Sequence, residues 1–260
     1  MFGDRFYPLL AHLSPWKQSL FALALAQRQL ANFCLWSSLA KQDQGSTHFA
    51  NCLKQLWYYH QDKFNHIDLS KALAQFDPFV PDLEQEADPE DPSTGALLAT
   101  DAAICLTVAY DAILMHEGNE AEIASRASLS AAILVARQRA EDFLDDEALR
   151  DTAEVDNEVN FQVSLLELLI KAQRDPSLVH LILKSSTKDG CSNIGLTLTE
   201  DLPYLHADFY ALEVQKLKAA AAQGKAATAH KAKVSSPYGK VPRGGRKHGA
   251  PGHKLKGRDN

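Results

Sequence analysis

The sequence lacks a long apolar run, a leader-like N-terminus and clustered cysteines. No run reaches about 18 uninterrupted apolar residues, which predicts that the chain has no transmembrane helix. The N-terminus has no basic region followed by an apolar stretch and a small-residue cleavage site, so no secretory signal is expected. The cysteines form no CxxC pair, which argues against a zinc site and a disulfide framework. They are widely scattered, at Cys34, Cys52, Cys105 and Cys191. We therefore expect a protein of the reducing cytoplasm with no membrane partner.

The short motifs that accompany common catalytic and cofactor sites are also missing. There is no GxxxxGK[ST] phosphate loop, no GxGxxG after a strand and no GxSxG nucleophile elbow. The body of the chain has no Glu-x-x-His pair, which a di-metal carboxylate bundle needs. The sequence therefore predicts no catalytic residue, no metal site and no cofactor, and it favours a non-enzymatic protein.

What the 260 residues do contain is a helical pattern, because apolar residues recur at helical rather than alternating spacing. Proline or a capping side chain marks several helix starts, as at Ser14-Pro15, Ser93-Thr94 and Asp175-Pro176. The predicted fold is an all-α multi-helix bundle over residues 1–197. The expected helices cover about residues 16–36 (with a break near Asn32), 68–76, 95–116, 120–143, 155–174 and 176–189. A further helix is expected after the cap at Gly45-Ser46, with an apolar stripe from Phe49 to Trp57.

Charge is distributed unevenly along the chain. Residues 1–215 hold 15 Lys and Arg against 32 Asp and Glu, a balance of −17, whereas residues 216–260 hold 12 against one, a balance of +11. The two balances sum to the net charge of −6. Such asymmetry predicts an acidic body that carries a basic tail.

The chain beyond the bundle divides into two expected parts. Residues 198–223 form an extension with an amphipathic pattern that permits a helix over about 204–222. Residues 224–260 are rich in Gly, Pro and Lys and almost free of large apolar side chains. Because such a segment buries too little surface to offset its chain entropy, we expect a disordered basic tail.

Three polar residues occupy helix positions where the pattern places apolar ones. Asp101 lies in the stripe of the 95–116 helix, and Glu158 and Gln162 lie four residues apart on one face of the 155–174 helix. A buried carboxylate must be paired, protonated or hydrogen-bonded, and Arg126 and Arg137 are the expected partners. Two interpretations stay open: a polar ligand pocket that uses a carboxylate as acid or base, and a structural network that fixes the helix register.

The most recognisable segments are LLATDAAICL with Asp101, ASRASLSAA with Ser125 and Ser128, VDNEVNFQVSLLELL with Glu158, and GCSNIGL with Asn193. On these segments, residues 8–197 resemble the YjaG-like family of bacterial proteins, a domain of unknown function. The resemblance implies a helical, soluble, cytoplasmic protein and implies no activity. Within the GCSNIGL segment, Asn193 completes the set of candidate pocket residues, and Gly195 suits a positive φ.

The basic tail is the feature that indicates a partner class. Its Lys and Arg alternate with Gly, Pro and Ala, as in arms that follow a phosphate backbone, and its scarce aromatic side chains argue against base readout. Non-specific DNA or RNA contact, docking on an acidic protein surface and a solubilising extension are the three interpretations. The candidate contact residues are Lys231, Lys233, Lys240, Arg243, Arg246, Lys247, Lys254, Lys256 and Arg258.

Overall fold

The computed structural model describes residues 1–42, 44–61, 67–85, 90, 92–140, 143–187 and 190–197. The chain divides into two units, Met1–Lys216 and Leu217–Asn260, and every described residue belongs to the first. The predicted all-α fold is confirmed for the described residues, which contain ten α-helices and one isolated bridge between Cys191 and Thr197 but no strand. The helix expected over 204–222 and the disordered tail expected over 224–260 lie outside the described residues.

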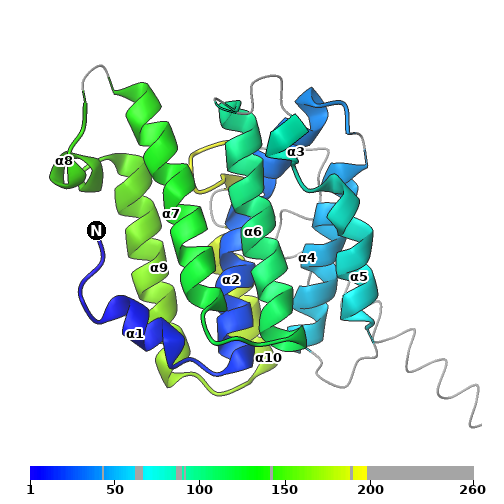
Figure 1. Cartoon of the computed structure of the whole chain (residues 1–260). Helices are drawn as coiled ribbons and strands as arrows, with labels where there is room; N and C mark the ends of the chain where they lie inside the picture. The colour runs from blue at the N-terminus through cyan, green and yellow to red at the C-terminus, as the bar shows by residue number, and fades with distance from the viewer. Residues whose placement is uncertain are drawn as a thin grey trace, which may run out of the picture. The chain divides into compact units, whose positions relative to one another are not determined.

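The helices of the described part pack against one another in a bundle (Figure 1). They are α1 (Phe6–Ala11), α2 (Pro15–Arg28), α3 (Leu30–Leu39), α4 (Gly45–Gln61), α5 (Leu69–Phe76), α6 (Thr94–Leu114), α7 (Glu120–Arg139), α8 (Asp146–Arg150), α9 (Ala153–Lys171) and α10 (Pro176–Ser186). Two single-turn 3-10 helices, η1 (Asp77–Phe79) and η2 (Leu83–Gln85), follow α5.

Several helices begin where the sequence predicts, because their capping residues satisfy exposed backbone N–H groups. Asp68, Ser93 and Asp175 each accept a backbone hydrogen bond in the first turn of α5, α6 and α10. Pro15 and Pro176 occupy the start of α2 and α10. Helices α1 and α8, of six and five residues, were not predicted.

The long helix expected over 16–36 is two helices, and the break lies at Gln29 rather than near Asn32. The backbone of Gln29 departs from helical geometry with φ −101° and ψ 4°. Its side chain is buried, and Nε2 donates to Cys105 Sγ of α6 at 3.1 Å. The break therefore coincides with a contact between Gln29 and α6, which the spacing of apolar residues does not predict.

α6 is the central helix, and small side chains make up much of its buried surface. It packs against α2, α3 and α7 (Figure 1), and alanines along it are buried, which permits close approach of the neighbouring helices. By length and composition α6 is the one described helix that passes the test for a membrane span, and half of its most apolar stretch is buried in the bundle. The central helix of a globular core has the same properties.

Candidate functional site

Glu158 of α9 is completely buried, and both oxygens of its carboxylate are hydrogen-bonded. Oε2 accepts from Arg28 at the end of α2, from Nε at 3.3 Å and from Nη2 at 3.1 Å. Oε1 accepts from Ser128 Oγ of α7 at 2.6 Å and from Gln162 Nε2 at 2.8 Å. A buried charge requires a partner of opposite charge and hydrogen bonds to its remaining lone pairs. All these requirements are met inside the bundle.

Gln162 continues the same network toward α7. Ser125 Oγ donates to Gln162 Oε1 at 2.5 Å, and Gln162 Nε2 donates to the Ser125 carbonyl at 3.2 Å. Gln162, Ser125 and Ser128 are all buried. We call Arg28, Ser125, Ser128, Glu158 and Gln162 the Glu158 cluster. It joins α2, α7 and α9 by polar contacts that a packed apolar interface does not provide.

Asn193 attaches the loop after α10 to this cluster. Its Nδ2 donates to the Ser128 carbonyl at 3.2 Å, its Oδ1 accepts from Asn32 Nδ2 at 2.9 Å, and its backbone N–H donates to the Arg28 carbonyl at 3.0 Å. Ser192 Oγ accepts from the backbone N–H groups of residues 194 and 196. Gly195 has φ +82°, the backbone conformation that its lack of a side chain permits. The loop is therefore a fixed part of the bundle.

Asp101 lies at the margin of the buried face of α6. Its neighbours Ala99, Ala102 and Cys105 are completely buried, whereas Asp101 is half-buried. The prediction places Asp101 inside the core, whereas the structure leaves its side chain only partly buried. Burial raises the pKa of Asp101 to about 7, and a hydrogen bond from Ser130 opposes that rise.

The two expected arginine partners are wrong for Glu158, since Arg137 is exposed and Arg126 pairs elsewhere. The side chain of Arg126 is 61% exposed, pairs with Glu122 at 2.7 Å on its own helix and lies over the Tyr7 ring. The guanidinium that reaches Glu158 is that of Arg28, 130 residues away in the chain. In the sequence, the only hint of this role is that Arg28 follows the apolar run 20–26 by two residues.

A serine–histidine pair lies elsewhere in the core. Ser19 Oγ and His60 Nε2 are 2.8 Å apart, a spacing that nucleophile–base pairs share. Both residues are buried, and Ser19 Oγ also donates to the Ala109 carbonyl at 2.6 Å. Burial lowers the pKa of His60 to about 3, so the imidazole is neutral at physiological pH. The pair is a core hydrogen bond with no access for a substrate.

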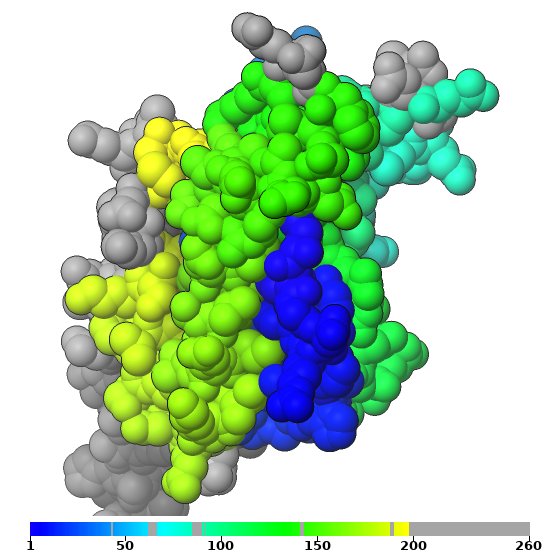
Figure 2. Space-filling model, turned by 90° about the vertical axis from the view of Figure 1, so that its left-hand side faces the viewer, coloured from blue at the N-terminus to red at the C-terminus, as the bar shows by residue number. Residues whose placement is uncertain are grey.

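Beside the Glu158 cluster the surface is hollowed by a groove of about 560 Å³. Figure 2 shows the face on which the 190–197 segment, in yellow, lies beside α9. The groove is lined by Arg28, Arg139, Ala153, Glu154, Asn157, Phe161, Ser185 and residues 191–195. Its volume falls within the range of about 300–1,000 Å³ that small-molecule sites occupy.

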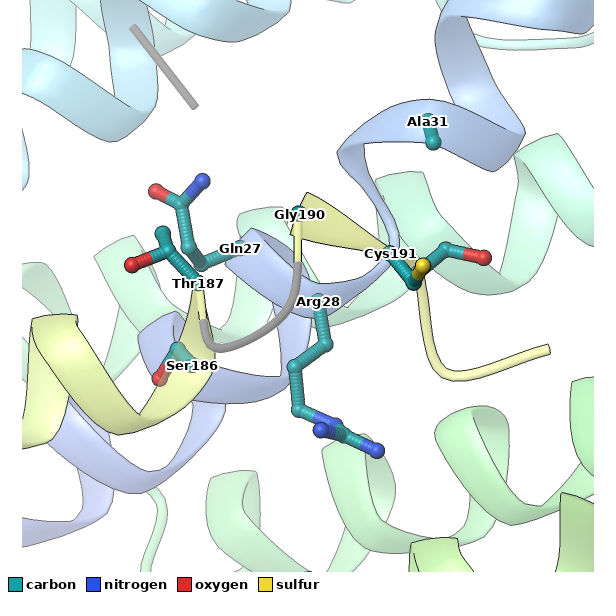
Figure 3. Close-up of a pocket in the computed structure, with 8 residues that line it drawn as sticks. Gln27, Arg28, Ala31, Ser186, Thr187, Gly190 and Cys191 are labelled. Carbon is teal, nitrogen blue, oxygen red and sulfur yellow. The ribbon is translucent and has the colours of Figure 1, made fainter. Parts of the chain in front are cut away.

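A second, smaller cavity of about 10 Å³ is lined by residues that include Gln27, Thr187 and Gly190 (Figure 3). This is about the space of one water molecule. Gln27 is buried, its Oε1 accepts from Trp57 Nε1 at 3.0 Å, and its Nε2 has no partner among the described residues. In Figure 3 the Arg28 guanidinium points away from the Gln27 amide. Arg28, Cys191 and Ser192 line both the cavity and the groove, whereas Gln27 lines the cavity alone.

Metal ligation finds no support in the described part of the chain, where no three His, Cys, Asp or Glu side chains lie close enough to share an ion. Of the predicted pocket residues, the structure brings together Glu158, Gln162 and Asn193 and places Asp101 and Arg126 elsewhere. The predicted contact residues of the basic tail lie outside the described residues.

Comparison with known proteins gives a consistent result. A family model described as "Protein of unknown function (DUF416)" matches residues 5–197. The chain is 24% identical over 190 residues to a protein of Haemophilus influenzae described as uncharacterised, covering 72% of this chain and 94% of that one. A crystal structure of a DUF416 family protein from Shewanella baltica superimposes with a TM-score of 0.63 and 24% identity, over 76% of this chain and all of that one. The likeness to the solved structure concerns the fold.

Proposed function

The chain belongs to the DUF416 family, whose description names no activity, and we propose that it is a non-enzymatic interaction protein that contacts nucleic acid through its basic C-terminal segment. The observation that carries the proposal is the charge separation of −17 for residues 1–215 and +11 for residues 216–260. Lys and Arg spread along a Gly- and Pro-rich segment neutralise successive phosphates and release their counterions, which gives affinity without sequence preference. A cytoplasmic location, with access to RNA and DNA, is part of the proposal.

The Glu158 cluster supports the non-enzymatic half of the proposal. The partners of Glu158 and Gln162 are one another and the side chains of Arg28, Ser125 and Ser128. A general acid or base must reach a substrate proton directly or through one water. Glu158 is completely buried, so the alternative of an inward pocket built on Asp101, Glu158 and Gln162 has less support than a structural network.

The test is fluorescence anisotropy of labelled duplex DNA and single-stranded RNA with the full-length protein across a salt series. We expect log K to fall linearly with log salt, with a slope between about −4 and −8 for duplex DNA if half to all of the nine candidate residues contact phosphates. A full-length variant with all nine changed to Gln should lose most of this affinity. The nine are Lys231, Lys233, Lys240, Arg243, Arg246, Lys247, Lys254, Lys256 and Arg258.

The matched control changes exposed cations of the bundle, Lys71, Lys171 and Lys184, to Gln. This variant should bind like the unmodified protein. Equal binding by the nine-residue variant, or no binding of either nucleic acid at low salt, contradicts the proposal. In the second case, docking of the basic segment on an acidic protein surface becomes the next interpretation to test.

A further inference from the structure

The groove beside α9 presents hydrogen-bond donors that the bundle does not use. Arg28 donates from Nε and Nη2 to Glu158. Its Nη1 has no partner among the described residues and is not buried. The side chain keeps 14% of its surface exposed and lines the groove. The unpaired edge of the guanidinium therefore faces the groove.

This guanidinium is held rigidly from two sides. The buried Glu158 carboxylate fixes one edge, and the Phe161 ring lies under its plane, 4.1 Å from the guanidinium carbon to the ring centroid. A donor whose rotamer is already fixed loses little conformational freedom when a ligand binds. Arg28 is thus pre-organised to accept a ligand at its outer edge.

Other residues that line the groove also offer hydrogen-bond donors. Arg139 contacts Glu154 through Nη1, and its side chain is 61% exposed, so its other nitrogens remain available. Asn157 is exposed on the α9 wall of the groove. The two carboxylates of the site, Glu154 and Glu158, are each occupied by an arginine. Because both carboxylates are neutralised, the remaining N–H groups of Arg28 and Arg139 are left for an acceptor-rich ligand.

We propose that this groove binds a small molecule through an oxyanion group, a carboxylate or a phosphate, held between the outer edge of Arg28 and Arg139. A planar guanidinium donates two parallel hydrogen bonds to either group, which is the geometry that favours arginine at such sites. The Phe161 ring and the backbone of residues 192–195 provide the less polar wall for the remainder of the ligand. The proposal is independent of the nucleic-acid contact of the basic segment.

The test measures the melting temperature of the full-length protein in sodium phosphate and in sodium acetate, each against sodium chloride of equal ionic strength. At about ten times Kd we expect a saturable rise of about 3–6 °C over chloride. A rise with both anions identifies a general oxyanion site, phosphate alone a phosphorylated ligand, and acetate alone a carboxylate ligand. No rise over chloride with either anion overturns the proposal.

Two variants separate the groove from other anion-binding parts of the chain. Ala153 is exposed and lines the groove, so Ala153→Trp fills it, whereas Ser164→Trp adds the same side chain to an exposed α9 position outside the groove. The rise should vanish in A153W and persist in S164W, and an equal rise in both contradicts the proposal. If A153W does not fold, Arg139→Gln decides instead: Kd for the anion should increase at least several-fold, and an unchanged Kd refutes the assignment.

Discussion

Replacing Arg28 by Met tests the structural interpretation of the Glu158 cluster. Met keeps most of the apolar stem of the side chain but leaves the carboxylate of Glu158 without its cation, while Ser128 and Gln162 still donate to Oε1. Breaking a buried ion pair on one side costs about 3–5 kcal/mol, because the remaining charge is desolvated without compensation. For a domain of this size the loss corresponds to a fall in Tm of about 6–20 °C.

The double variant R28M/E158Q distinguishes a buried charge from simple loss of packing. Gln keeps an oxygen that accepts from Ser128 and Gln162 but removes the uncompensated charge, so the double variant should recover most of the stability that R28M loses. Arg126→Met is the matched control, because that arginine forms an exposed pair with Glu122 and such pairs contribute about 0–1 kcal/mol.

The measurement is urea unfolding of the three variants, followed by far-ultraviolet circular dichroism. The reasoning is refuted if R28M unfolds at the same urea concentration as R126M. It is also refuted if the double variant is no more stable than the single one. The first result would mean that the carboxylate of Glu158 is not desolvated in solution, and the cluster would then have to be reconsidered as an accessible site. The second would mean that R28M is destabilised by lost packing and not by an uncompensated charge.

Two further predictions concern titration and thiol reactivity. Because burial raises the pKa of Asp101 to about 7, the folded state holds a proton that the unfolded state releases near pH 4, so this group's contribution to stability falls between about pH 4 and 7. Asp101→Asn should match the unmodified protein at pH 4 and be more stable at pH 8, and an identical pH profile of Tm would contradict this. In thiol titration of the native protein at pH 8, Cys191 should react first, since it is half-buried, and fast labelling that survives Cys191→Ser would refute the prediction. The other thiols are buried, and burial raises their pKa, to about 11 for Cys34 and Cys52 and well above its usual value for Cys105.

Helix positions followed from local chemistry wherever a cap or a proline marked them. Ser93 and Asp175 form the side-chain caps that the sequence predicts, and α6 and α10 begin beside them. α8 has five residues, fewer than apolar periodicity needs, although Asp145 and the acidic residues after it are the signature of a helix start. Short helices of this kind are detected by their caps or not at all.

The orientation of α6 could not be predicted, because apolar residues surround the helix on nearly all sides. With so uniform a surface, spacing alone does not fix which face is most buried. Helical spacing places Met115 on the same stripe as Asp101, yet Met115 is 70% exposed and Asp101 half-buried. The actual core face follows from the packing of α2, α3 and α7 against α6, which local spacing does not encode.

In the candidate site, contacts within one helix could be predicted, whereas contacts between distant segments could not. Glu158 and Gln162 were predicted as a buried pair because both sit on one helix, where a spacing of four fixes their proximity. The partner of Glu158 is Arg28, and the groove is formed by segments as distant as α2, α9 and the loop at residues 191–195. Contacts across such separations are set by the tertiary fold, so the sequence supports the existence of a buried carboxylate but not the identity of its cation.

The extent of the relatives separates the two proposals. The proteins from Haemophilus and Shewanella are matched over 94% and 100% of their lengths but cover 72% and 76% of this chain. The family match ends at residue 197, before the basic segment begins. The proposed nucleic-acid contact of residues 216–260 therefore lies outside the region that the family model matches. The groove, in contrast, lies entirely within the matched region. A function that the bundle shares with its relatives must use residues of the matched region. Anion binding at Arg28 belongs to that region, so it can be tested independently of the basic segment.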